Sequence, residues 1–198
     1  MGHEPVVQPV LMAHPLPITV DLGGVIALAF TSRNAVAAFA RECPRRDLPV
    51  FAVGEATAAD ARDAGFHEVI SADGDVVALA ALIAERRPSG VVLHPAAAEP
   101  AGDLAGRLAA SGVEVRTLAI YETVETELGP PSDVDAVLIH SPRAARIVAR
   151  ILSPARVAGM EAFCISAAAA ESLGGVKFQR VAVAPYPNEQ ALLKLLMR

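Results

Sequence analysis

The sequence predicts an α/β protein built from two similar domains, each a doubly wound parallel sheet. Three observations lead to this class. The 198-residue chain is 53% hydrophobic, so it can bury substantial cores. Aromatic residues make up only 4%, so alanine and valine supply most of the apolar surface, which suits helices packed closely on parallel strands. Strand-like and helix-like segments also alternate in an order that occurs twice.

The repeat is clearest in two segments of equal length. Residues 25–43, VIALAFTSRNAVAAFAREC, have the pattern of a strand, a polar turn and a helix, and residues 134–152, VDAVLIHSPRAARIVARIL, have the same pattern. They align without a gap at an offset of 109 residues, so that Ser32 corresponds to Ser141. This order of elements predicts two domains of one architecture. The next strand, turn and helix also recur, with residues 50–65 matching 162–175 and Gly54 matching Ser166.

The first copy continues with two further units. Residues 67–87 predict a strand, an Asp-Gly-Asp turn and an amphipathic helix, and residues 90–121 predict a strand, a helix and a final strand. Strands that alternate with helices in this way form a doubly wound parallel sheet. We therefore expect a flavodoxin-like sheet in a continuous domain at 20–120.

The N-terminal segment predicts that the second domain is discontinuous. GHEPVVQPVL at 2–11 resembles GVEVRTLAIY at 112–121, a glycine followed by a strand. We expect residues 1–13 and 130–198 to form this domain, and we expect the domain to lack its first strand and helix. Three explanations would fit this expectation. The start of the chain is assigned too late, a second subunit completes the sheet, or the protein is a reduced relative with impaired activity. The connections at about 12–19 and 121–133 carry prolines and predict a two-stranded linker.

Charge and composition exclude several classes of function. The net charge is −5 and the basic residues form no long run, so we expect no nucleic-acid partner. No apolar stretch approaches the roughly 20 residues that span a bilayer, and no signal peptide is evident, so we expect no membrane association and a cytoplasmic location. The five histidines have no metal-ligand spacing, which predicts no metal site. His94 and His140 each end a predicted strand, where a capping or solvated role is expected.

Polar residues follow the predicted strands in both copies. Carboxyl ends of parallel strands meet at one sheet edge, where the free N–H groups of helix N-termini attract carboxylates and phosphates. Such edges on two facing domains would line a cleft. The alternative for each residue is ordinary helix capping. The candidate binding residues are Thr31, Ser32, Arg33, Asn34, Gly54, Thr57, Ser141, Pro142, Arg143 and Ser166.

Tyr121 is a separate candidate because the chain has only two tyrosines and this one lies where the returning linker leaves the first domain. A phenol there can donate a proton or a hydrogen bond to a ligand. The alternative is a linker residue whose ring is packed and whose hydroxyl contacts water.

An ordered set of motifs resembles one family across nearly the whole chain: FTSRNAV, VFAVGEATAADARDAGF, ADGDVVALAALI, AGDLAGRLAASGVEV followed by YETV, IHSPRAA, CIS and PNEQALLKLL. The chain resembles uroporphyrinogen-III synthase. The resemblance implies two α/β domains joined by two strands, the second formed from both chain ends. It also implies a lyase without a cofactor that closes hydroxymethylbilane into uroporphyrinogen III, inverts the last pyrrole ring and releases water.

The resemblance also implies roles for particular residues. Tyr121 matches a linker tyrosine that assists the leaving hydroxyl, and Thr57 matches a threonine near the substrate, so these two are the candidate catalytic residues. Ser32, Asn34 and the serines at 141 and 166 match turns that line the cleft. A monomer is expected unless a partner completes the sheet. Two other hypotheses stay open: a non-catalytic or impaired tetrapyrrole-binding relative, and a two-domain protein that binds another small anion.

Overall fold

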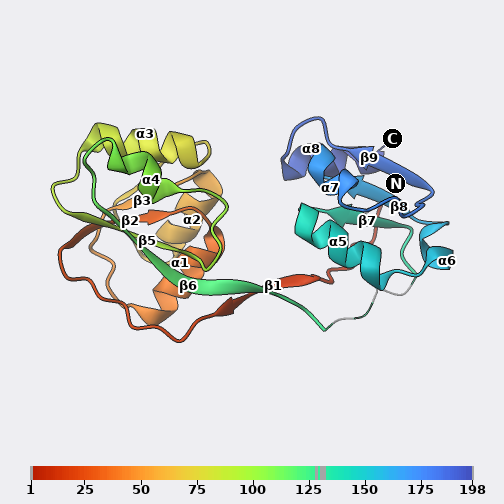
Figure 1. Ribbon diagram of the computed structural model, residues 1–198, viewed down its shortest axis with the longest axis horizontal. Coiled ribbons are helices and arrows are strands. Elements are labelled where there is room, and N and C mark those ends of the chain that lie inside the picture. The colour runs from red at the N-terminus through yellow and green to blue at the C-terminus, as the bar shows by residue number, and fades with distance from the viewer. Residues whose placement is uncertain (1, 128, 130–132, 198) are drawn as a thin grey trace. The chain divides into compact units, whose positions relative to one another are not determined.

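The computed structural model of the protein describes residues 2–127, 129 and 133–197. The chain divides into two compact units: unit 1 comprises residues 1–12 and 125–198, and unit 2 comprises residues 13–124. The domain boundaries expected from the sequence differ from this division by a few residues. Residues 128 and 130–132, within the predicted linker 121–133, lie outside the described residues. Figure 1 shows the elements of each unit.

Unit 2 is organised around a six-stranded sheet in the order β1-β6-β5-β2-β3-β4. The five strands β2 to β6 all run parallel to one another. One helix follows each of the strands β2, β3, β4 and β5. The elements are β1 (Leu11–Pro15), β2 (Val25–Phe30), α1 (Arg33–Glu42), β3 (Val50–Ala52), α2 (Glu55–Asp63), β4 (Val69–Ser71), α3 (Val76–Arg86), β5 (Val91–Ala97), α4 (Leu104–Ala109) and β6 (Val115–Glu125).

The strand order corrects one expectation from the sequence. Numbered along the chain from β2 to β6, the parallel strands lie in the order 3-2-1-4-5, and the direction of winding reverses between β2 and β5. A flavodoxin-like sheet has the order 2-1-3-4-5. The sheet is doubly wound, but the flavodoxin-like order was wrong for this unit. Local helix and strand patterns do not encode the side of the sheet to which each connection returns.

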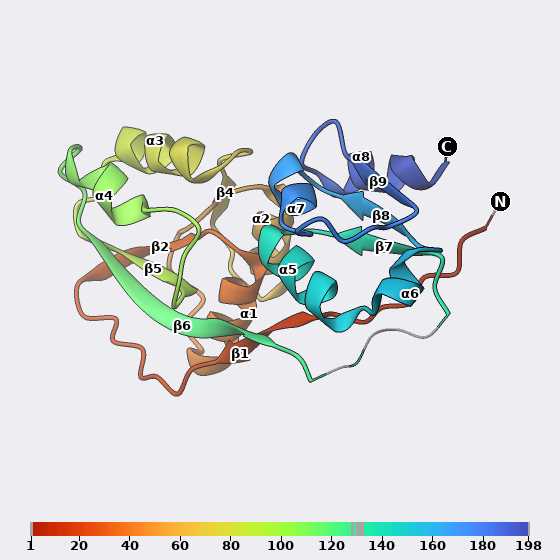
Figure 2. The ribbon, with the colours of Figure 1, turned by 45° about the vertical axis from the view of Figure 1, so that its right-hand side comes forward.

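Two helices cover each face of this sheet, because alternate strand residues point to opposite faces. Leu28 and Phe30 of β2 pack with α1 in one core, in which the rings of Phe30, Phe39 and Phe66 lie with centroids 5.8 to 6.3 Å apart. Ala27 and Ala29 of the same strand face a second core that includes residues of α3 and α4. The unit is therefore a three-layer α/β/α structure (Figure 2).

The N-terminal segment departs from its prediction. Residues 2–9 have no helix or strand, and the first strand begins only at Leu11, so the strand expected at 2–11 was wrong. Pro5 and Pro9 supply no N–H donors to a ladder, and Val7 is 89% exposed, so the apolar pattern is not buried.

The strands β1 and β6 both continue across the boundary between the units. They run antiparallel, since Leu16 N–H donates to Ile120 O while Thr126 N–H donates to Val10 O. These two strands cover residues 12–15 and 121–125 of the segments expected to be linkers.

Unit 1 contains a three-stranded parallel sheet in the order β7-β8-β9. One face packs against α5 and α7, with Ile139 and Cys164 in that core, and the other packs against α8 and the terminal 3-10 helix, with Phe163 and Leu192 in the core. That unit 1 lacks its first strand and helix stays a prediction. The elements are β7 (Ala136–Ile139), α5 (Pro142–Ile151), α6 (Pro154–Val157), β8 (Glu161–Cys164), α7 (Ala167–Glu171), β9 (Arg180–Val183), α8 (Glu189–Leu193) and the 3-10 helix η1 (Lys194–Met197).

The internal repeat has a direct counterpart in these elements. The bounds of α5 equal those of α1 shifted by 109 residues, and β7 ends 109 residues after β2 ends. Equivalent turns in the two units therefore carry equivalent helix starts.

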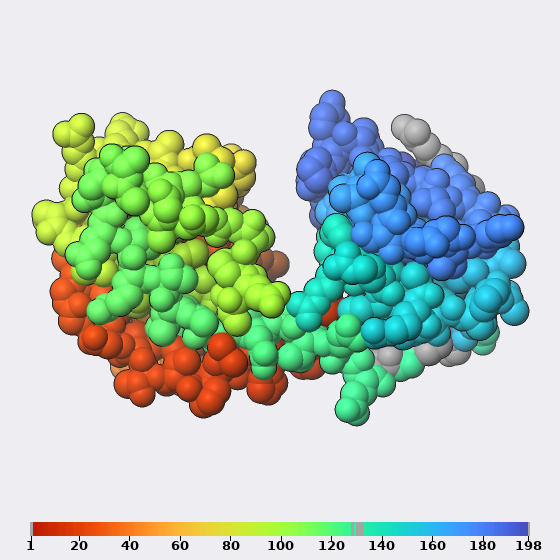
Figure 3. All heavy atoms as spheres, viewed as in Figure 1, coloured from red at the N-terminus to blue at the C-terminus, as the bar shows by residue number. Residues whose placement is uncertain are grey.

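Side chains from α3, α4 and β6, in yellow to green, form much of the face of unit 2 that Figure 3 shows.

Candidate active site

The turn after β2 lies at the carboxyl edge of the sheet in unit 2. Ser32 is the N-cap of α1, and its hydroxyl oxygen accepts a hydrogen bond from the Ala35 N–H at 3.1 Å. The same oxygen lies 2.9 Å from the Tyr121 hydroxyl. Ser32 is thus both a helix cap, as the alternative from the sequence held, and the partner of the tyrosine.

A β-bulge accounts for the orientation of Tyr121. Ala96 of β5 pairs with Ala119 of β6, but the next residue, Ala97, pairs with Tyr121, so that Ile120 is an extra residue on β6. A bulge of this kind re-aims the side chains that follow it. Tyr121 is 7% exposed and packs in the core beside α1, where its hydroxyl meets Ser32.

The prediction of a capping or solvated role for His94 was wrong. The residue lies inside β5 rather than at a strand end, is 1% exposed, and its Nε2 atom lies 3.1 Å from the Thr31 hydroxyl oxygen. Burial lowers the pKa of His94 to about 4, so its imidazole is neutral at pH 7. The sequence predicted a turn directly after His94, and no local signal marked the residue as buried.

Arg33 and Asn34 begin α1 and are exposed. The Arg33 guanidinium donates to both carboxylate oxygens of Asp60 on α2, at 2.6 and 3.0 Å. This hydrogen-bonded pairing raises the pKa of Arg33 and lowers that of Asp60. The charge of Arg33 is therefore balanced within unit 2, and an incoming anion would compete with Asp60 for it.

The turn after β3 holds the next two candidates. Gly54 is the N-cap of α2, and its carbonyl accepts from the N–H groups of Thr57 and Ala58. Thr57 lies in the first turn of α2 and is 5% exposed. The turn thus offers backbone groups at its surface while the threonine side chain is largely withdrawn.

The equivalent turns of unit 1 form a second polar edge. Ser141 caps α5 by accepting from the Ala144 N–H at 3.1 Å, Pro142 is its first residue, and Arg143 is exposed. Ser166 caps the short α7 by accepting from Ala169 N–H. These residues follow the neighbouring strands β7 and β8, so the structure groups them within unit 1, as it groups Thr31, Ser32 and Tyr121 within unit 2.

Neither a metal-binding cluster nor a membrane-spanning helix is found in the described part of the chain. There, no group of three or more His, Cys, Asp or Glu side chains is arranged to hold a metal ion. None of the described helices has the length and hydropathy needed to cross a membrane. The polar groups that do converge are hydroxyls, an imidazole and backbone amides.

These features define an α/β protein with two units whose parallel sheets present capped helix starts at their carboxyl edges. A family model described as uroporphyrinogen-III synthase HemD matches residues 1–194. The chain belongs to the uroporphyrinogen-III synthase family, a family of lyases in tetrapyrrole biosynthesis.

Solved structures share this fold at low sequence identity. Uroporphyrinogen-III synthetase from Helicobacter pylori is 19% identical, with a TM-score of 0.75 over 98% of this chain and 95% of that one. A mutant uroporphyrinogen III synthase from Thermus thermophilus is 18% identical, with a TM-score of 0.53 over 96% of this chain and 86% of that one. Among curated proteins, none matches this sequence.

Proposed function

We propose that the protein is a uroporphyrinogen-III synthase that converts hydroxymethylbilane into uroporphyrinogen III with inversion of the last pyrrole ring and loss of water. Membership of the family supports the reaction class. The hydrogen bond between the buried Tyr121 and Ser32 is the observation that carries the proposal for this chain. It places a phenol at the carboxyl edge of the sheet, where α/β proteins bind their ligands.

The geometry suggests how Tyr121 assists the first step. The Ser32 oxygen already accepts the Ala35 N–H, and its single proton is free to donate to the Tyr121 oxygen. The phenol proton is then available to the hydroxymethyl oxygen of the bilane. Protonation lets that oxygen leave as water and produces an azafulvene cation, while Ser32 stabilises the phenolate through its hydrogen bond. Ring closure releases one proton, which restores the phenol.

The chain carries a net charge of −5, so its surface as a whole does not attract the carboxylates of the bilane. We propose that local hydrogen-bond donors bind them instead. The N–H groups of the first two residues of α1 and of α2 precede those that Ser32 and Gly54 engage, and they are the donors that we propose for the carboxylates at the edge of unit 2. Thr57 lies at the start of α2, and Ser141 at the start of α5 adds its hydroxyl group. We propose no cofactor for the reaction.

Freshly prepared hydroxymethylbilane, with separation of the product isomers, tests the proposal. The protein is expected to yield predominantly the type III isomer, and Tyr121→Phe is expected to lower kcat by about 10²- to 10⁴-fold, the usual contribution of a general acid. Tyr186→Phe is the matched control, since Tyr186 is the other tyrosine and is 69% exposed.

Product no richer in the type III isomer than the spontaneous type I background would contradict the proposal. Tight binding of the bilane without turnover would instead support the non-catalytic relative.

A further inference from the structure

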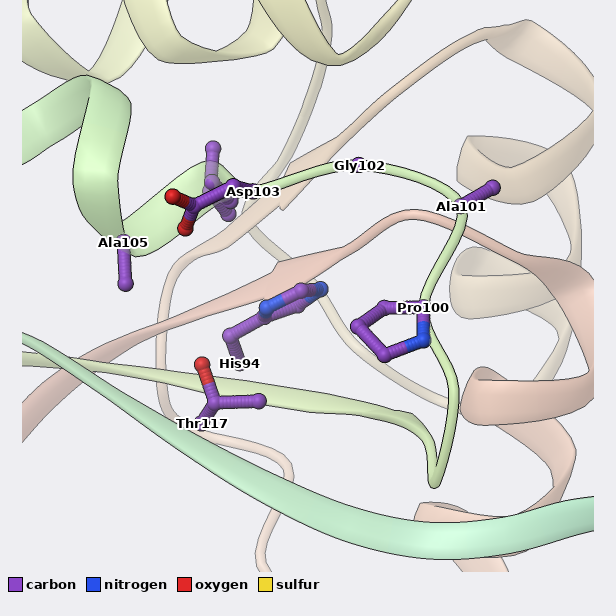
Figure 4. A pocket seen from close by; sticks show the side chains of 8 residues that line it. His94, Pro100, Ala101, Gly102, Asp103, Ala105 and Thr117 are labelled. Carbon is purple, nitrogen blue, oxygen red and sulfur yellow. The ribbon is translucent and has the colours of Figure 1, made fainter.

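A cavity of about 350 Å³ lies over the middle of β5 and β6 in unit 2. His94 and Thr117 form its floor, since they are register partners on these two strands and so share a face of the sheet. The loop from Pro100 to Asp103 covers them, and Ala105 of α4 closes one side (Figure 4). A volume of this size is within the range of small-molecule pockets, about 300–1,000 Å³.

The polar side chains of the cavity are an imidazole, a hydroxyl and a carboxylate, each of which has a hydrogen-bond acceptor atom. The His94 imidazole, whose Nε2 atom is engaged by Thr31, lies beside Thr117, and Asp103 contributes a carboxylate whose Oδ1 atom accepts from Gly106 N–H at 2.8 Å. Among the described residues that line it there is no lysine or arginine. Carbon atoms of Pro100, Ala101 and Leu104 supply the rest of the wall.

This combination selects against anions and in favour of an uncharged ring. Burial keeps the imidazole neutral near pH 7, so it offers no positive charge to a carboxylate, and Asp103 repels one. The Thr117 hydroxyl and the second oxygen of the Asp103 carboxylate can each accept a hydrogen bond from an N–H group, whereas the imidazole is 1% exposed and lies beneath them. Apolar walls favour the faces of a flat ring.

We propose that this cavity is a binding site for a neutral, planar heterocycle with an N–H donor, and that in the bilane it receives one pyrrole ring rather than a carboxylate side chain. The part that concerns the bilane rests on the proposed function. The site differs from the turns proposed above for the carboxylates, because those turns offer donors whereas this cavity offers acceptors.

Three small probes test the ligand class without any turnover. Pyrrole is expected to shift the assigned His94 ring resonances in a saturable NMR titration at pH 7, with a dissociation constant of about millimolar, as for other ligands this small. Furan has a similar ring without the N–H group and is expected to bind about ten-fold more weakly. Pyrrole-2-carboxylate is expected to cause no saturable shift. Equal binding of the anion, or no shift with pyrrole, would overturn the proposal.

A pair of variants on one helix tests the location. Ala105→Leu fills the cavity and is expected to weaken pyrrole binding at least ten-fold, whereas Ala109→Leu, on an exposed position of α4 outside the lining, leaves it unchanged. Both substitutions keep a good helix former, and circular dichroism checks the fold. Equal binding by the two variants would contradict this site.

The bilane assay then separates this inference from the proposed function. If the cavity holds a pyrrole ring of the substrate, Ala105→Leu raises KM at least ten-fold relative to Ala109→Leu. An unchanged KM would overturn the assignment to the bilane. Absence of turnover in the unmodified protein would contradict the proposed function alone, since the pyrrole titration decides the binding site by itself.

Discussion

At the scale of single residues, Ser32 combines a structural and a chemical contact. Its oxygen caps α1 through the Ala35 N–H and also meets the Tyr121 hydroxyl. Asn188 provides a matched case, since it caps α8 by accepting from Ala191 N–H at 2.8 Å. The comparison of these two caps can separate helix stability from an effect on the tyrosine.

We expect Ser32→Ala and Asn188→Ala each to lower the free energy of unfolding by about 1 kcal/mol, the usual cost of a lost N-cap. Only Ser32→Ala is expected to lower kcat with hydroxymethylbilane, by at least about ten-fold, because it removes the hydrogen bond that orients Tyr121. Urea unfolding and the isomer-resolved assay measure the two effects. Equal kcat values in the two variants would show that Ser32 acts as a cap alone.

Burial of His94 makes stability depend on pH. Its pKa in the folded protein, about 4, lies below the ordinary value of 6.5 that applies in the unfolded chain. Between these values the unfolded state binds more protons, so stability is fully present above about pH 6.5 and falls as the pH drops toward 4. The loss is at most about 3 kcal/mol, from about 1.4 kcal/mol for each unit of pKa difference.

Urea unfolding between pH 7 and pH 4 measures this loss, and His94→Gln is the comparison because its amide does not titrate. The protein is expected to lose more stability than the variant over this range. Parallel curves for the two proteins would argue against a buried neutral imidazole.

At the scale of elements, one arginine joins the ends of two helices. The Arg46 guanidinium donates to the carbonyl oxygens of Ala40 and Cys43 at the end of α1 and of Ala64 after α2. The Cζ atom of this guanidinium lies 4.9 Å from the centre of the Phe66 ring. Unpaired carbonyls at helix ends need such donors, and the positive charge also suits a helix C-terminus. These contacts hold α1 and α2 together on the face that carries Tyr121.

We expect Arg46→Ala to lower the free energy of unfolding by about 1–3 kcal/mol, since it leaves several carbonyls without their donor. Arg45→Ala is the control, because Arg45 forms an exposed pair with Asp47 and such pairs contribute little. Thermal unfolding of both variants measures the difference. Similar midpoints would mean that water replaces Arg46 at these helix ends.

At the scale of the whole molecule, unit 2 has the features of an independent folding unit. It is a continuous segment, residues 13–124, and both faces of its sheet are covered by helices. Residues at both of its ends contribute to the core: Ala13 and Ile18 pack against it, and Tyr121 is buried in it.

We expect the isolated fragment 13–124 to unfold cooperatively with a native-like circular dichroism spectrum. The shorter fragment 20–120 is expected to be less stable by at least about 2 kcal/mol, because it removes Tyr121 and the apolar side chains that precede residue 20. Urea titration of both fragments measures this difference. Equal stabilities would show that the ends of the unit do not contribute to its core.

Much of the fold follows from local patterns. Apolar runs such as residues 25–30 predict strands, and a serine before a helical pattern predicts an N-cap, which is what Ser32 and Ser141 are. The exact shift between α1 and α5 also follows from the repeat in the sequence. The strand predicted within residues 2–11 does not extend over residues 2–9, although the valines there have the apolar pattern of a strand. Pro5 and Pro9 explain this, because neither residue has an N–H group to donate to a neighbouring strand.

The α/β class, the repeat, the capped turns and the candidate tyrosine could be predicted from the sequence, because each is visible in short residue patterns. The strand order, the bulge that turns Tyr121 toward Ser32, and the burial of His94 against Thr31 became evident only from the folded structure. The two side-chain contacts join residues 63 and 89 positions apart, and the energies of all these features arise from contacts that no local pattern records.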